Sequence, residues 1–164
     1  MKKGFTLMEI LLVLGIILML ATIGLGVFAG SRRNLTIDLE TDKLIAVLNG
    51  LRGNAQAKAE CFGIEFERNK PPQKITAPYL NRMQGCDANE NRSALSWEKD
   101  IAISDLLLDG GSKNEFAVWF VPPNGKLKLN PDAVTGEIIL AIPSPAAVSK
   151  KITLYANTGV IEKK

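Results

Sequence analysis

The apolar residues of this chain follow three patterns along its length, and each pattern predicts a different kind of element. The first is a continuous block, since the only polar side chains from Phe5 to Ala29 are those of Thr6, Glu9 and Thr22. The twenty residues from Ile10 to Ala29 would form a helix about 30 Å long, which matches the hydrocarbon core of a bilayer. This length favours a permanent membrane segment over a cleaved secretory signal, whose apolar region is shorter.

The second pattern is a stripe of apolar residues at three- and four-residue steps, which begins after Arg33. Such spacing places the residues on one face of a helix, with the charges mostly on the other faces. We therefore expect one long helix from Phe5 to about Glu60, its first half in lipid and its second half packed on a sheet. The stripe consists of Ile37, Thr41, Leu44, Leu48, Leu51, Ala55 and Ala59.

The third pattern has a period of two and predicts antiparallel strands. Phe62, Ile64 and Phe66 alternate with glycine and glutamate, as in a half-buried strand. The proline-rich and polar residues from 71 to about 99 predict a long connection. Further strands are expected at 101–108, 116–121, 126–129, 137–142 and 150–155, with a two-residue hairpin turn at Asn124-Gly125 and a short last strand after 157–159. The predicted fold class is therefore α+β, with a long N-terminal helix packed on an antiparallel sheet.

Composition removes several classes of function. The chain has 164 residues and a net charge of +3, of which Lys2 and Lys3 supply two charges, so its basic character is a weak argument for nucleic-acid binding. Histidine, the commonest general base and metal ligand, is absent from the sequence. The sequence has no phosphate-binding glycine motif and no nucleophile motif, and the Gly110-Gly111 pair is typical of a turn. We expect neither an enzyme nor a cofactor.

The residues at the very start decide the orientation, which the charges alone leave open. Lys2 and Lys3 before the apolar block nearly balance Arg32 and Arg33 after it under the positive-inside rule. The stretch Lys-Lys-Gly-Phe-Thr-Leu-Met-Glu-Ile, followed by the apolar block, resembles the start of type IV prepilins and type II secretion pseudopilins. Those chains share a short basic leader ending in glycine, then Phe-Thr-Leu, a glutamate five residues into the mature chain, and an apolar helix.

The resemblance implies a processing site, an assembly site and a location. The prepilin peptidase would cleave after Gly4 and methylate the new terminus at Phe5, and Phe5 and Glu9 would serve filament assembly. The chain would then divide into a leader at 1–4, a transmembrane and polymerisation helix at 5–30, and an extracytoplasmic pilin-like domain at 31–164. It would be a single-pass protein of the bacterial inner membrane, with its C-terminal domain in the periplasm or on a surface filament. Its partners would be other pilin or pseudopilin subunits, the prepilin peptidase and N-methyltransferase, the inner-membrane assembly platform and membrane lipid.

Glu9 has a physical role in that setting. Cleavage creates a positive amine at Phe5, at the positive end of the helix dipole and four residues before Glu9. A lone charge at bilayer depth costs on the order of 3 kcal/mol, which the amine of a neighbouring subunit would offset. Such a pair fixes the axial register of stacked subunits more than it adds stability. The alternative is an incidental carboxylate near the membrane surface.

The rest of the chain is similar to one subgroup of these proteins. The stretches LIAVLNGLRGNAQAKAECFGIEFE, EFAVWFVPPNGKLKLNPDAVTGEIILAI and KKITLYANTGVIEK resemble GspH/FimT-type minor pseudopilins. The shared features are a strand ending in aromatic-x-Pro-x-Gly, a later strand, and a final turn that carries glycine. The implied function is that of a structural subunit of a type IV pilus or a type II secretion pseudopilus. A DNA-uptake minor pilin and an anchored binding domain that never polymerises are the alternatives.

Three candidate sites lie in the part that the resemblance places outside the cytoplasm. Cys61 and Cys86 have one available pairing in an oxidising compartment, so we predict a disulfide, with two unpaired thiols as the alternative. Closing a loop of 24 intervening residues would stabilise the fold by roughly 3–4 kcal/mol.

The other two candidates have weaker support. Oxygen-bearing side chains follow the spacing of a calcium loop, but Arg92 stands where that loop needs glycine, so a solvated loop is the favoured interpretation. Clustered lysines on late strands offer a DNA contact, although lysine also protects strand edges from aggregation, and DNA is not favoured as a partner. The calcium candidates are Asp87, Asn89, Asn91, Ser93 and Glu98, and the DNA candidates are Lys126, Lys128, Lys150 and Lys151.

Overall fold

The computed structural model describes residues 6–58, 60–81, 85–86, 91–97, 101–143 and 148–164, without the side chains of 23–29, 76–81 and 85. The chain divides into two compact units, residues 1–35 and 36–164.

A single long helix, α1, runs from Leu7 to Ala57, close to the predicted span. Its residues up to Leu35 belong to the first unit and those from Thr36 onward to the second. In the second unit the predicted stripe is confirmed, since Ile37, Thr41, Leu44, Leu48, Leu51 and Ala55 are all buried. Ala59, the last predicted member, lies outside the described residues. The buried Thr41 hydroxyl donates to the carbonyl of Ile37 at 2.6 Å, so this polar group is hydrogen-bonded inside the core.

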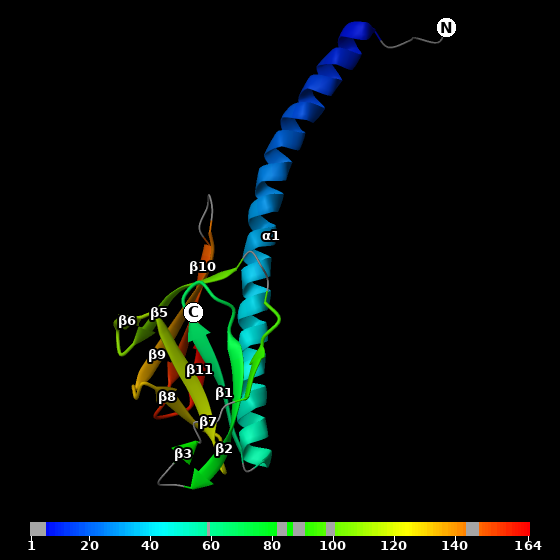
Figure 1. Ribbon diagram of the computed structural model, residues 1–164. Helices are drawn as coiled ribbons and strands as arrows, with labels where there is room; N and C mark the ends of the chain where they lie inside the picture. The colour runs from blue at the N-terminus through cyan, green and yellow to red at the C-terminus, as the bar shows by residue number, and fades with distance from the viewer. Residues whose placement is uncertain (1–5, 59, 82–84, 87–90, 98–100, 144–147) are drawn as a thin grey trace. The chain divides into compact units, whose positions relative to one another are not determined.

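The strands of the second unit form two antiparallel sheets, so the α+β class is confirmed, with two sheets in place of one (Figure 1). The first sheet has the order β3-β2-β1-β7-β8, with β4 paired to β2, and the second has the order β11-β10-β9-β5-β6. The strands are β1 (Glu60–Glu67), β2 (Gln73–Asn81), β3 (Gly85–Cys86), β4 (Asn91–Ala94), β5 (Ala102–Leu108), β6 (Gly111–Lys113), β7 (Glu115–Val121), β8 (Lys126–Asn130), β9 (Thr135–Ile142), β10 (Val148–Tyr155) and β11 (Val160–Lys163).

One apolar core joins α1 to both sheets. The alternation along each strand sends every second side chain into it, because successive residues of a strand point to opposite faces. From the first sheet come residues of β1 and β7, and from the second come residues of β9 and β10. Its members include Leu44, Leu48, Phe62, Ile64, Phe66, Phe116, Val118, Phe120, Ile138, Leu140, Ile152 and Leu154.

Two predictions about the connections are corrected. The segment from 71 to 99 is not simply a long connection, because it contributes β2, β3 and β4. Its prolines are compatible with pairing: Pro71 and Pro72 precede β2, and Pro78 lies where the pairing of β2 with β1 ends, opposite Glu60.

The second correction concerns the turn between β7 and β8. Val121 pairs with Lys126, so the turn has four residues, 122–125, and only Gly125 has a positive φ, of 60°. A two-residue turn of the expected type needs positive φ at both positions. That geometry occurs instead between β5 and β6, where Asp109 and Gly110 have φ of 48° and 80°. The turn expected at Gly110-Gly111 is thus confirmed, with Gly111 as the first residue of β6.

Candidate functional site

The start of α1 carries a capping motif that sequence reasoning missed. Thr6 lies just before the helix, and its Oγ1 accepts a hydrogen bond from the backbone N–H of Glu9 at 3.3 Å. Its carbonyl accepts from the N–H groups of Glu9 and Ile10 at 3.1 and 3.2 Å. Thr-x-x-Glu is the pattern of a capping box, and an acidic residue in the first turn is favourable toward the helix dipole. Gly4 and Phe5, the predicted processing residues, lie outside the described residues.

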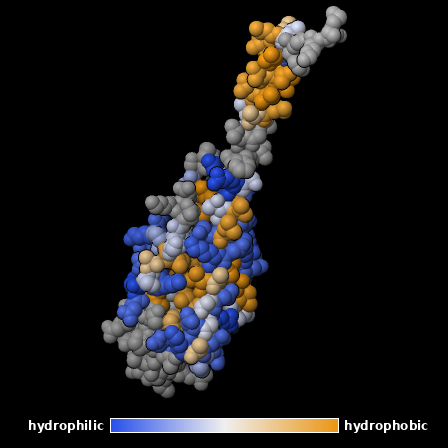
Figure 2. Space-filling view, turned by 90° about the vertical axis from the view of Figure 1, so that its right-hand side faces the viewer, coloured by the Kyte–Doolittle hydropathy of each residue, from blue (hydrophilic) through white to orange (hydrophobic). Residues whose placement is uncertain are grey.

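Glu9 stands among exposed apolar side chains. The large apolar residues from Leu7 to Leu20 are 48–79% exposed, on all faces of the helix. On the face seen in Figure 2, these side chains form a hydrophobic surface on the first half of α1. Glu9, Ile10, Val13 and Leu14 line a shallow open hollow of about 270 Å³ on one face. The carboxylate therefore borders an apolar surface that nothing else in residues 1–35 covers, as far as that unit is described.

The sequence predicts that the first half of α1 crosses a membrane. Over the described residues, no helix has both the length and the apolar character needed to cross a membrane. The transmembrane assignment of the first half of α1 stays a prediction.

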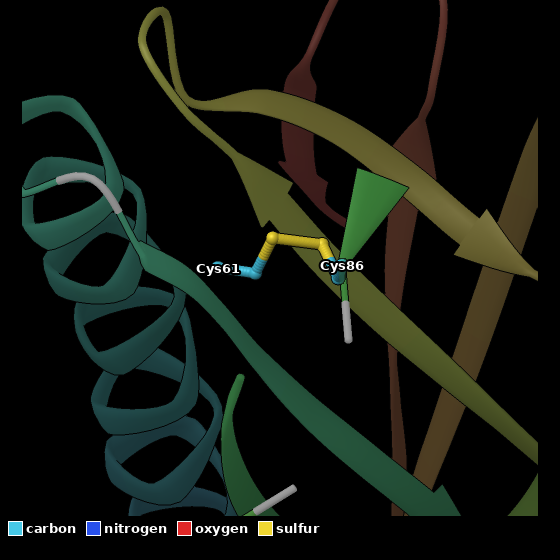
Figure 3. Close-up of a disulfide and its surroundings, with 2 residues drawn as sticks. All are labelled: Cys61 and Cys86. Atoms are coloured by element: carbon cyan, nitrogen blue, oxygen red, sulfur yellow. A yellow bond between two sulfur atoms is a disulfide. The ribbon is translucent and has the colours of Figure 1, made fainter. Parts of the chain in front are cut away.

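The disulfide between Cys61 and Cys86 is confirmed (Figure 3). The two Cα atoms lie 5.9 Å apart, and the bond joins the start of β1 to β3. Cys61 is fully buried in a second apolar cluster with Ile75, Ala117 and Trp119, on the face of the first sheet opposite the main core. The sequence predicted the pairing, but it gave no sign of this cluster.

The four lysines proposed to contact DNA are divided between the two sheets. Lys126 and Lys128 lie exposed on β8, an edge strand of the first sheet, whereas Lys150 and Lys151 lie on β10 in the second sheet. The ammonium of Lys150 lies 3.2 Å from an Asp38 carboxylate oxygen, and that of Lys151 donates to Glu137 at 3.0 Å. Half of the proposed contact set is therefore already paired with carboxylates.

Lys163 of β11 pairs with two carboxylates of α1, those of Asp38 and Asp42. Lys163 contacts Asp42 at 2.8 Å and Asp38 at 3.2 Å. The ammoniums of Lys163 and Lys150 lower the pKa of the Asp38 carboxyl, and Asp42 and then Asp38 raise the pKa of Lys163. These pairs are largely solvated, so they orient the last strand more than they stabilise it.

The calcium hypothesis gains no support from the described part of the candidate loop. Asp87, Asn89 and Glu98 lie outside the described residues, and Asn91 belongs to β4, where it pairs with Thr76 of β2. Among the residues that the structure describes, no group of three or more acidic or sulfur-bearing side chains is placed to hold a metal ion.

Two glycine turns approach the last part of α1, one from each sheet. A Cβ on Gly125 would lie 2.9 Å from Cγ of Arg52 and 3.0 Å from Cγ of Gln56, and one on Gly159 would lie 3.1 Å from an Arg52 guanidinium nitrogen. Nη1 of Arg52 donates to the carbonyl of Gly159 at 3.0 Å, and Gln56 donates to the carbonyl of Asn124 at 3.2 Å. Both glycines also have positive φ, so each is required for conformation and for space.

Two polar clusters that the sequence did not indicate also position the strands. The Asp109 carboxylate accepts from the N–H groups of Thr135 and Val134 at 2.7 and 3.0 Å, which fastens the β5–β6 turn to the start of β9. Arg68, just after β1, pairs with Asp105 of β5 and donates to Ser112 of β6 at 2.8 Å. The side chains in these clusters have local structural partners.

Compared with known proteins, the chain matches no protein-family model, no curated protein and no solved structure.

Proposed function

We propose that this chain is a minor pilin or pseudopilin, a structural subunit of a type IV pilus or a type II secretion pseudopilus. In this proposal the chain is inserted in the bacterial inner membrane, cleaved after Gly4, methylated at Phe5, and assembled through the first half of α1. Residues 31–164 then form the extracytoplasmic domain, which presents its surface to neighbouring subunits.

One observation carries the proposal: the Glu9 carboxylate is the only charge in an exposed apolar segment. It lies five residues after Gly4, the glycine that would end the leader. Glu9 is the only charged residue between Phe5 and Ala29. The side chains around it are exposed, so they need a cover of lipid or of other helices. The amine that cleavage would create at Phe5 supplies the counter-charge, and stacked subunits would bring the two groups together.

The capping motif supports the same position for the mature terminus. With Thr6 as the residue before the helix, cleavage after Gly4 leaves a single residue, Phe5, in front of the cap. The new amine would then lie near the first turn, where the unpaired N–H groups of the helix also favour the Glu9 carboxylate. The cap gives Glu9 a local role as well, which an experiment must separate from assembly.

The test compares Glu9→Gln with Thr6→Ala in cells that build the filament. Glu9→Gln keeps the shape of the side chain and removes its charge, so we expect incorporation to fall on the order of tenfold or more, because the partner amine is left unpaired in low dielectric. Thr6→Ala removes only the cap, a loss of about 1 kcal/mol at one end of a long helix, and should incorporate nearly normally. Glu60→Gln, in an exposed position at the start of β1, is the matched control for loss of one carboxylate.

Each rival predicts a different result. If the chain is an anchored domain that never polymerises, Glu9→Gln would not change the amount of the chain found with filaments. A loss as large in Thr6→Ala as in Glu9→Gln would assign Glu9 to the cap alone. The DNA-uptake alternative requires DNA retention by the full chain that disappears with added salt.

A further inference from the structure

β3 lies at the edge of the first sheet, where the disulfide ties it to β1 and Cys86 packs against the second apolar cluster. β3 consists of two residues and pairs only with the end of β2, where Tyr79 lies opposite Cys86 and Asn81 opposite Gly85. The pairing of β2 with β1 ends at Pro78, and its pairing with β4 ends at Thr76. In the described part of the chain, residues 79–81 thus have no strand partner except β3. Two short strands without further neighbours are marginally stable by themselves.

The other end of the disulfide lies in the second apolar cluster. Cys61, Ile75, Ala117 and Trp119 are buried there, with Trp119 only 7% exposed, and Cys86 and Val121 pack against them. Gly63 makes this packing possible, because a Cβ on it would lie 3.0 Å from Cε3 of Trp119 and 2.5 Å from the carbonyl oxygen of Val118. Neither cysteine belongs to the main core between α1 and the sheets.

We propose that the Cys61–Cys86 disulfide is a redox-sensitive cross-link that keeps the second apolar cluster, which contains Trp119, shielded from solvent. When a dithiol reduces it, β3 and residues 79–81 separate from the first sheet and the cluster becomes accessible to solvent. The core that joins α1 to both sheets stays folded. This inference does not depend on the proposed function.

The burial of the two sulfur-bearing residues sets the order of the chemical steps. Cys86 is half-buried and Cys61 is fully buried, so a thiolate of the dithiol attacks Sγ of Cys86. The bond between the two protein sulfurs breaks, and Cys61 leaves as a thiolate that takes up a proton. The second thiol of the reductant then attacks the mixed disulfide, which releases Cys86 as a thiol and the reductant as its cyclic disulfide. Two electrons pass from the dithiol to the protein.

Hydrogen exchange of the full-length protein in detergent micelles, with and without dithiothreitol, tests this proposal. Reduction should raise the exchange of the amides at Tyr79, Asn81 and Gly85–Cys86 on the order of 100-fold, since a tether across a loop of this length is lost. The amides of β9 and β10 should keep their protection. Acrylamide quenching of tryptophan fluorescence should increase at the same time, and reoxidation should reverse both changes.

A variant with Cys61→Ala and Cys86→Ala is the matched control. It should resemble the reduced protein under both conditions and should not respond to dithiothreitol. If this variant does not fold, the reversible change in hydrogen exchange of the natural chain on reduction and reoxidation still tests the proposal. Unchanged exchange at β3 after confirmed reduction would overturn the proposal, and so would a loss of protection in β9 and β10 as large as that in β3.

Discussion

The two halves of α1 have the same secondary structure and opposite surroundings. From Leu7 to Leu20 the large apolar side chains surround the helix and are about half or more exposed, whereas Ile37, Leu44 and Leu48 are completely buried on one stripe. The second half receives its cover from two sheets of the same chain. The first half has no such cover within the described part of its unit. The comparison teaches that helix formation and burial are separate properties: the first half needs a partner of another kind, which we propose to be lipid and neighbouring subunits.

The largest expected effect is a difference in stability between substitutions in the two halves of α1. Leu48→Ala removes a fully buried side chain from the main core and should lower the free energy of unfolding by about 2–5 kcal/mol. Leu11→Ala, in a position that is 61% exposed, should leave the denaturant midpoint of the second unit unchanged. Chemical unfolding of both full-length variants in the same detergent checks this pair. Equal losses would show that the first half is packed within the chain.

An intermediate effect on stability is expected where alanine replaces a glycine that has no room for a side chain, compared with a glycine that has room. Gly63→Ala places a methyl group 2.5 Å from the carbonyl oxygen of Val118 and should cost about 1–3 kcal/mol. Gly50→Ala is its control, because nothing lies within 4 Å of a Cβ there and alanine favours the helix, so a gain of about 0.5–1 kcal/mol is expected. Thermal unfolding measures both. A stabilising Gly63→Ala would mean that Trp119 and the Val118 carbonyl can move away from the added methyl group without loss of packing.

The smallest effect concerns acid sensitivity of the β-domain. The backbone N–H groups of Thr135 and then Val134 lower the pKa of Asp109, so its contribution to stability is full above the ordinary carboxyl pKa and is lost as the pH falls through the folded-state value. Asp109→Asn should therefore be less stable than the natural chain at pH 7, and the difference should shrink as the pH drops below about 4. Urea midpoints measured between pH 7 and pH 2.5 give the two curves. If the two curves of urea midpoint against pH were parallel, Asp109 would not contribute to the acid sensitivity of the domain.

Periodicity predicted the fold well wherever a single face is buried. The helical stripe at Ile37–Ala55 and seven of the strands were expected, because burial on one face leaves a clear repeat in the sequence. β2, β3 and β4 were missed, since their prolines and polar residues are typical of loops and their pairing depends on β1 and the disulfide. β6 was missed as well, because its three residues are too few to show a period of two.

The candidate site was only partly predictable from the sequence. The order Gly-Phe-Thr-Leu-x-Glu is local, so the motif can be recognised, and the Thr-x-x-Glu cap within it was available to inspection and was missed. The second apolar cluster was not predictable, because Gly63, Ile75 and Trp119 meet only when three strands are aligned in register. The pairing of Lys150 with Asp38 likewise joins positions more than a hundred residues apart, which no periodic pattern records.

The most direct test of the proposed function is the N-terminal sequence and intact mass of the protein recovered from membranes of cells that process it. The proposed function predicts a chain that begins at methylated Phe5, with Glu9 as its fifth residue. A chain that keeps Met1, or one that begins beyond Gly30, would contradict it.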